Sequence, residues 1–253
     1  MDVRKELTAF QRFLEWTERF KGRTVVFRGV DDVRQMWPAA VRSFFRSRGE
    51  TPGANDEETL AAFRDYERAL FANFRREAIL LTEHMPRDDW QWLAVAQHYG
   101  LPTRLLDWSR SPLVALYFAV SHGDGSEPSR VYAYNWGPVG REVGTIDPAA
   151  EPLRSPLDYA DEIGRFAPPI ISKRMAEQEG VFTIQGNPLR AIDEVASDRV
   201  QHHEIEPDKR DGVLIDLFRL GISASSLFRD LPGLAETLRW VYEDYIPRLG
   251  RGD

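Results

Sequence analysis

The sequence contains no cysteine among its 253 residues. This absence excludes a disulfide framework, a thiolate metal site and a cysteine nucleophile, and it is typical of proteins from a reducing compartment. The sequence also lacks a long uncharged apolar run, and its first residues, MDVRKELTAF, are charged and amphipathic. These features argue against a signal peptide and a membrane span. We therefore expect a soluble, cytoplasmic protein with no membrane partner.

Several common catalytic motifs are missing as well. The sequence has no GxxxxGK[ST] phosphate loop, no GxGxxG fingerprint, no HExxH zinc motif and no GxSxG elbow. His202 and His203 are adjacent, so they point to opposite faces of a strand and do not form one zinc site. Pro207 and Asp208 resemble the start of a restriction-type nuclease motif, but no Glu-x-Lys follows them. We expect no bound metal.

Acidic residues outnumber basic residues in this chain. The formal net charge is −7 and the pI is about 5.4, which argues against strong nonspecific affinity for nucleic acid but leaves a local basic patch open. The hydrophobic content of 42% and the aromatic content of 11% are those of an ordinary globular protein. A chain of this length can bury one large core or two small ones, and we favour a single domain over residues 1–253.

The hydrophobic pattern predicts an α+β fold. Helices are expected at 5–20, 36–48, 57–82, 88–97, 111–122, 209–220 and 232–246. Extended segments are expected at 24–30, 103–106, 130–136, 180–184 and 202–205. The polar face of the long helix at 57–82 is interpreted as solvated. Residues 137–170 are rich in proline, glycine and acidic residues, which predicts a long excursion with one short helix near Asp158.

The stretch from Gln97 to Val120 is the most informative. Gly100 and Pro102 end one helix and keep the next residues extended, and Ser111 with Pro112 begins an apolar helix. Polar side chains therefore gather at a strand-to-helix corner, where backbone N–H groups point outward and bind anions readily. These side chains are His98, Tyr99, Thr103, Arg104, Asp107 and Ser109.

A purely structural interpretation of this corner remains open. In that interpretation Ser111 is only a helix cap, Arg104 and Asp107 form an internal ion pair, and Trp108 anchors the core. Capping and pairing are the commonest uses of these residue types. Their clustering beside an apolar helix favours a ligand site instead, because unsatisfied polar groups cost stability.

Arg28 lies in the expected strand 24–30, where alternation places it on the same face as Val26. An inward arginine needs an anion, and Gly29 directly after it indicates close approach by backbone or by a ligand. Alternatively, Arg28 lies at a sheet edge, free in solvent or paired with a carboxylate. Residues 109–111 and 177–179 are polar too, and on one sheet they can join Arg28 around a ligand that carries phosphates and a ribose. The alternative for 177–179 is a solvated helix end.

Two segments resemble the FRG domain family, which is named after its Phe-Arg-Gly. They are Phe27-Arg28-Gly29 and the run QHYGLPTRLLDW from Gln97 to Trp108. Similarity continues through SPLVALYFA, Gln178-x-Gly180-Val181-Phe182 and the segment from Gly221 to Leu234. The resemblance spans roughly residues 24–240, and it implies one FRG-type domain acting in a bacterial toxin-like or phage-defence setting.

A looser resemblance is to ADP-ribosyltransferases of the Arg, Ser-x-Ser, Glu-x-Glu type. Arg28, Ser109-Arg110-Ser111 with its following helix, and Glu177-Gln178-Glu179 occur in the order of that family's motifs. The resemblance implies a split, mixed or antiparallel β core with several packed helices, and NAD as a substrate. The middle threonine of the family's motif is replaced by Arg110.

The same resemblance implies roles for individual residues. Glu179, Gln178 and Arg28 are the catalytic candidates, and Arg28 is also expected to hold the phosphates or the ribose of NAD. The full set of expected cofactor-binding residues is Arg28, Gly29, His98, Tyr99, Thr103, Arg104, Asp107, Ser109, Ser111 and Tyr117.

The leading interpretation is an NAD-dependent ADP-ribosyltransferase-like enzyme that modifies a protein, RNA or DNA target. A toxic enzyme of this kind needs an antitoxin or inhibitor protein as a partner. The alternative is a non-catalytic module that binds a nucleotide or a partner in a defence or toxin–antitoxin system. A third interpretation, a nuclease, predicts cleavage that a chelator abolishes.

Overall fold

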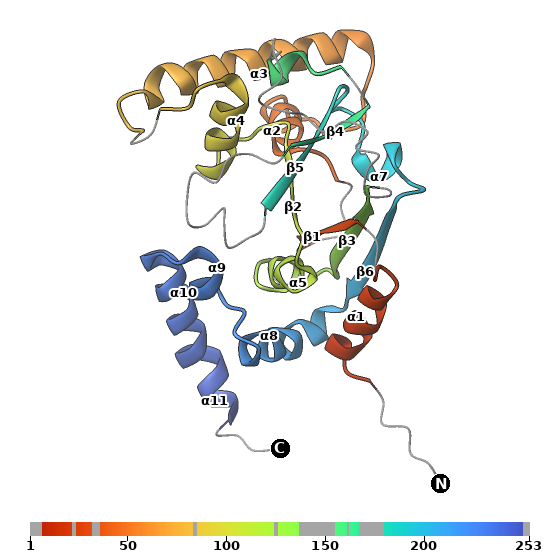
Figure 1. The fold of residues 1–253 in the computed structure, drawn as a ribbon, viewed down its shortest axis with the longest axis vertical. Helices are drawn as coiled ribbons and strands as arrows, with labels where there is room; N and C mark the ends of the chain where they lie inside the picture. Colours follow the sequence, from red (N-terminus) through yellow and green to blue (C-terminus); the bar gives the residue numbers. More distant parts are fainter. Residues whose placement is uncertain are drawn as a thin grey trace.

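The computed structural model describes residues 7–21, 24–31, 36–82, 85–123, 126–136, 155–160, 162–166 and 180–249. Within these residues the fold is α+β, as the sequence predicts, and six strands form one antiparallel sheet in the order β4-β5-β2-β1-β3-β6 (Figure 1). Among the described helices, none combines the length and the apolar character needed to cross a bilayer.

The strands are β1 (Val25–Val30), β2 (Leu106–Ser109), β3 (Ser129–Asn135), β4 (Ile163–Phe166), β5 (Gly180–Gln185) and β6 (Val200–Ile205). The longer helices are α1 (Ala9–Glu18), α2 (Ala39–Ser47), α3 (Glu57–Ala78), α4 (Asp89–His98), α5 (Pro112–Val120), α8 (Arg210–Arg219) and α10 (Leu231–Trp240). The shorter helical elements are η1 (Pro156–Asp158), α7 (Ile192–Val195), η2 (Pro207–Lys209), α9 (Ala224–Phe228), η3 (Val241–Tyr245) and α11 (Ile246–Leu249).

Most expected elements occur, and the exceptions have local causes. The extended segment expected at 103–106 is wrong in its bounds. The strand lies three residues later, because Leu106 to Ser109 pair with β5. Strand β4 lies inside the expected excursion at 137–170, and the short helix near Asp158 is the 3₁₀ turn η1. Helices α7 and α9 were not expected, since each is too short for a periodic pattern.

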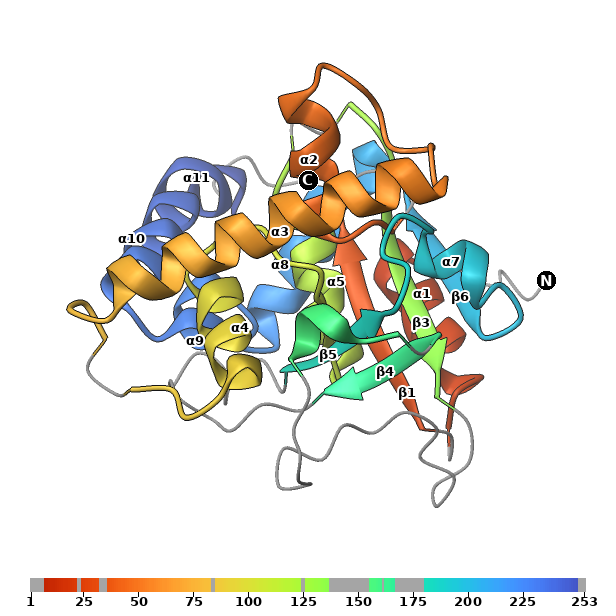
Figure 2. The ribbon, with the colours of Figure 1, turned by 90° about the horizontal axis from the view of Figure 1, so that it is seen from above.

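Different helices pack on the two halves of the sheet. Figure 1 shows α3 and α4 beside β4 and β5, and α1, α5 and α8 beside β1, β3 and β6, and in Figure 2 α3 lies across the strands. Alternation along β1 places Phe27 in the core with α5, whereas Val26 packs on the opposite face with Trp108 and with Ile192 of α7.

The pairing between neighbouring strands of the sheet is shortest between β1 and β2. These strands share one register pair, Phe27 with Ser109, whereas β1 pairs with β3 along all of Val25–Val30. The two halves, β4-β5-β2 and β1-β3-β6, therefore meet at a short junction. The described strands form one continuous sheet, and the split core implied by the looser resemblance stays a prediction.

Candidate functional site

A cleft of about 570 Å³ opens at the junction of β1 and β2. The end of β1 and β2 form its floor, while α2 and α5 contribute to its walls. Its lining residues are Phe27, Arg28, Gly29, Val30, Asp31, Met36, Trp37, Arg42, Arg46, Asp107, Trp108, Ser109, Val114, Ala115, Phe118, His122 and Gly180. The cleft belongs to the size range of small-molecule sites.

Arg28 lies in this cleft with its side chain 17% exposed. Its Nη1 donates a hydrogen bond to the backbone carbonyl of Asp107 at 2.8 Å and lies 3.6 Å from the Asp107 carboxylate. Its Nε is buried and has no hydrogen-bond partner among the described residues. A buried N–H without an acceptor is costly, so a ligand oxygen at this position would stabilise the side chain.

Asp107 is itself held by a chain of side chains. Gln97 donates its Nε2–H to the Asp107 carboxylate at 2.6 Å, and Thr103 donates its hydroxyl to the Gln97 carbonyl at 2.6 Å. The Thr103 hydroxyl also accepts the Leu105 N–H at 3.1 Å. Thr103 therefore orients Gln97 and Asp107, and through them Arg28, without lining the cleft itself.

Gly29 lacks a side chain because helix α5 occupies that space. A Cβ built on Gly29 would lie 1.8 Å from the Ala115 carbonyl oxygen and 2.6 Å from the Ala119 nitrogen. Both contacts are with backbone, so the helix cannot yield by a rotamer change. Of the two expectations for Gly29, close approach by backbone is the one observed, and the glycine places α5 against the strand that carries Arg28.

The serines of the expected Ser-x-Ser motif have different positions. Ser109 lines the cleft, and its hydroxyl accepts the Ser111 N–H at 3.0 Å. Ser111 caps α5 by accepting the Val114 N–H and is not a lining residue. Trp108 is buried and donates its indole N–H to Thr183 at 2.9 Å, so it anchors the core as well as lining the cleft.

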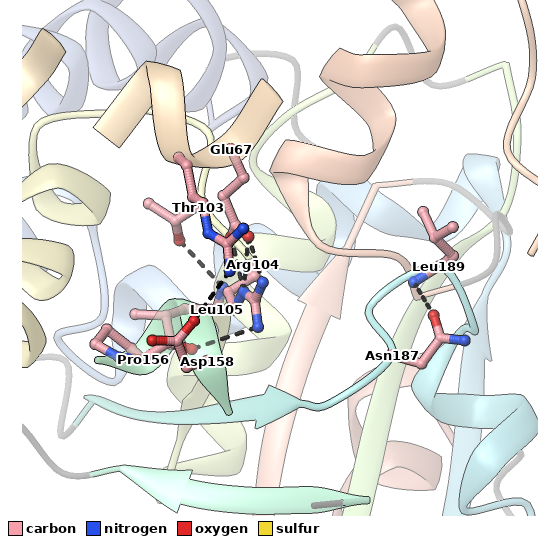
Figure 3. A network of polar contacts seen from close by, with 9 residues as sticks. Glu67, Thr103, Arg104, Leu105, Pro156, Asp158, Asn187 and Leu189 are labelled. Carbon is pink, nitrogen blue, oxygen red and sulfur yellow. Dashed lines mark hydrogen bonds and ion pairs between the residues drawn. The ribbon is translucent and has the colours of Figure 1, made fainter. Parts of the chain in front are cut away.

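Arg104 points away from the cleft. Its side chain is 1% exposed and forms a bidentate ion pair with Glu67 of α3, which is 3% exposed (Figure 3). Its Nη1 also donates to the Pro156 carbonyl at 3.3 Å. Arg104 therefore joins α3 and η1 to the core. The internal pair expected between Arg104 and Asp107 is wrong, because each residue has another partner.

Three further candidates lie outside the cleft. His98 and Tyr99 contact each other through their rings at the end of α4, and Tyr99 is 75% exposed. Tyr117 lines a second cavity of about 230 Å³ and donates its hydroxyl to Glu236 at 3.3 Å. Burial, aided by the Glu236 carboxylate, raises the pKa of Tyr117 above its usual range, so this hydroxyl stays protonated.

The expected catalytic residues Gln178 and Glu179 lie outside the described residues. Gly180, which follows Glu179 directly in the sequence, begins β5 and lines the cleft. Arg28, Ser109 and Gly180 thus open onto the same cavity. Arg28, Gly29, Asp107 and Ser109 are the candidate cofactor-binding residues that the structure brings together there.

Several lining residues are not among the candidates predicted from the sequence. Arg42 and Arg46 lie one helical turn apart on α2 and both face the cleft, and Trp37 and His122 contribute to its lining too. The i, i+4 spacing of the two arginines is a signal that was available from the sequence. Together with Arg28 they give the cleft three arginines against two carboxylates, Asp31 and Asp107.

Comparison with known proteins gives one family. Residues 23–127 match the family model described as the FRG domain. The matched segment includes β1, α2, β2 and α5, and it contains every lining residue of the cleft except Gly180. No curated protein and no solved structure matches the chain.

Proposed function

Because this chain contains an FRG domain over residues 23–127, and because that domain builds an arginine-lined cleft, we propose that the cleft binds NAD and that the protein transfers ADP-ribose to a macromolecular target. The observation that carries the proposal is the convergence of Arg28, Ser109 and Gly180 on one cavity. These positions come from segments far apart in the sequence. Arg28 and Ser109 belong to the first two transferase motifs, and Gly180 directly follows Glu179 of the third in the sequence.

The chemistry of the lining residues fits a dinucleotide. Arg28, whose buried Nε has no partner within the described part of the chain, and the arginines of α2 supply charged donors for a pyrophosphate. Trp37 and Phe118 supply aromatic surface for a base or a nicotinamide ring. The local excess of positive charge contrasts with the net charge of −7 of the whole chain, so it favours an anionic ligand in this cleft.

The proposed reaction breaks the bond between nicotinamide and the ribose C1′ of NAD. Nicotinamide leaves with the bonding electron pair, and a nucleophile of the target forms the new bond to C1′. Glu179 hydrogen-bonds a ribose hydroxyl and stabilises the positive charge that develops on the sugar. Arg28 holds the phosphates, and Ser109 orients the ribose.

Two variants test the proposal. Arg28→Ala removes the guanidinium at the floor of the cleft, and it should weaken NAD binding about tenfold or more in isothermal titration calorimetry. Glu179→Gln should retain NAD binding and lose nicotinamide release when labelled NAD is incubated with a cell lysate. Glu58→Gln, an exposed change on α3, is the matched control and should behave as the unaltered protein. Unchanged nicotinamide release by Glu179→Gln would contradict the catalytic assignment.

A second candidate function is a non-catalytic binding module that uses the same cleft. The pairing of Arg28 with Asp107 favours it, because a carboxylate beside the guanidinium opposes a phosphate and suits a more neutral ligand or peptide. This alternative predicts ligand binding by the unaltered protein with no nicotinamide release in any lysate. Under either function we propose a toxin-like or defence role in the cytoplasm, with an inhibitor protein as partner.

A further inference from the structure

The helix formed by α10, η3 and α11 exposes a row of large apolar side chains. Their exposed fractions are 80% for Leu231, 46% for Leu234, 48% for Leu238, 69% for Tyr242 and 46% for Ile246. We call these five residues the C-terminal stripe. Contiguous apolar surface of this kind marks interaction sites on soluble proteins. Figure 1 shows this helix at the edge of the molecule, clear of the sheet.

The π-helical turn η3 keeps the stripe straight. Residues four apart drift by about 40° around a regular α-helix, so Leu238, Tyr242 and Ile246 would spread around the helix. A π turn holds more residues per turn, which removes most of this drift over Val241–Tyr245. The three side chains therefore point in one direction.

The opposite side of the helix is attached to the body of the protein. Trp240 and Tyr245 both contact the ring of Phe218 on α8, each at 5.2 Å between ring centroids. This contact fixes the rotation of the helix about its axis. The C-terminal stripe consequently faces outward, because the helix cannot rotate to bury it without losing these ring contacts.

Charged residues beside the stripe indicate what covers it. Arg239 and Glu243 are both exposed, lie four residues apart on the same flank, and form no ion pair within the described chain. If two such helices pack antiparallel about a two-fold axis near Val241, Arg239 of each copy lies level with Glu243 of the other. In the same register, Leu238 of one copy inserts between Tyr242 and Ile246 of its partner.

We propose that the C-terminal stripe pairs with the same stripe of a second copy of this chain, which makes the protein an antiparallel homodimer. The contact is isologous, because each helix supplies both halves of the apolar row and both signs of charge. This proposal does not depend on the function of the cleft, whose lining residues belong to other elements.

Sedimentation velocity over a range of protein concentrations tests the pairing. The unaltered protein should be a dimer, and Leu238→Asp should be a monomer at every concentration. Arg239→Glu and Glu243→Arg should each raise the dimer dissociation constant about tenfold, because each creates two like-charge contacts. The double variant Arg239→Glu with Glu243→Arg should return to within about threefold of the unaltered protein, since it restores opposite charges across the interface.

Leu80→Asp is the matched control, because Leu80 is 93% exposed but lies on the turn after α3. It should leave the dimer intact. Circular dichroism and thermal unfolding of each variant separate loss of pairing from loss of fold. A monomeric unaltered protein would overturn the proposal. A double charge variant that pairs no better than the single variants would overturn the antiparallel register.

Discussion

Gly29→Ala should destabilise the protein by about 3 kcal/mol or more. The added Cβ would lie 1.8 Å from the Ala115 carbonyl oxygen, whereas ordinary contacts are 3.4–4 Å. Relief requires α5 to move away from β1 by roughly 1.5 Å, and interiors are packed too closely to absorb such a shift without lost contacts. The displaced helix carries Val114, Leu116 and Val120 in the largest apolar core.

Urea unfolding followed by circular dichroism measures this loss, and the thermal midpoint should fall by about 6–12 °C for a chain of this size. Gly212→Ala is the matched control. Gly212 lies in α8 with no atom within 4 Å of a built Cβ and without a positive φ, so alanine should stabilise the protein by about 0.5–1 kcal/mol. A Gly29→Ala protein within about 1 kcal/mol of the unaltered protein would refute the packing argument.

Three further outcomes are expected. Glu67→Gln should lower the free energy of unfolding by about 3–5 kcal/mol in urea, because it leaves Arg104 buried without its counter-charge. The double variant Glu67→Leu with Arg104→Met should recover most of that loss. A double variant as unstable as Glu67→Gln would contradict this explanation. Burial lowers the pKa of His203, so protonation favours the unfolded state and stability should fall as the pH drops below about 6.5; His203→Phe should remove that part of the decline, and an unchanged pH dependence would count against it. Arg46→Glu should weaken NAD binding by on the order of tenfold without changing stability, and unaltered affinity at low salt would remove Arg46 from the site.

Local patterns predicted the elements well where a long period was present. The apolar period from Leu60 to Ala78 predicted α3, and the cap at Ser111 predicted the start of α5. Strand β1 followed from its β-branched and aromatic residues. In contrast, β4 holds only four residues, Ile163–Phe166, in a segment rich in turn formers, so its pairing with β5 supplies the stability that its composition does not.

Contacts between distant segments were the main limit of sequence reasoning at the site. Glu67 has the same type and spacing as the solvated acids of α3, yet it is buried against Arg104, which lies 37 residues further along the chain. No local signal separates it from Asp65 or Glu77. The spacing of Arg42 and Arg46 places both on one face of α2, but only the fold shows that this face borders the end of β1.

The three residues Phe27, Arg28 and Gly29 have three different tasks in the structure. Phe27 packs in the core with α5, and Arg28 lies in the cleft beside Asp107. Gly29 lets the backbone of α5 touch the strand. Because Ala115 both contacts Gly29 and lines the cleft, the packing at Gly29 also sets the distance between the α5 wall and the Arg28 guanidinium. A larger residue at position 29 would therefore widen the cleft as it loosens the core, so stability and ligand affinity depend on the same contact.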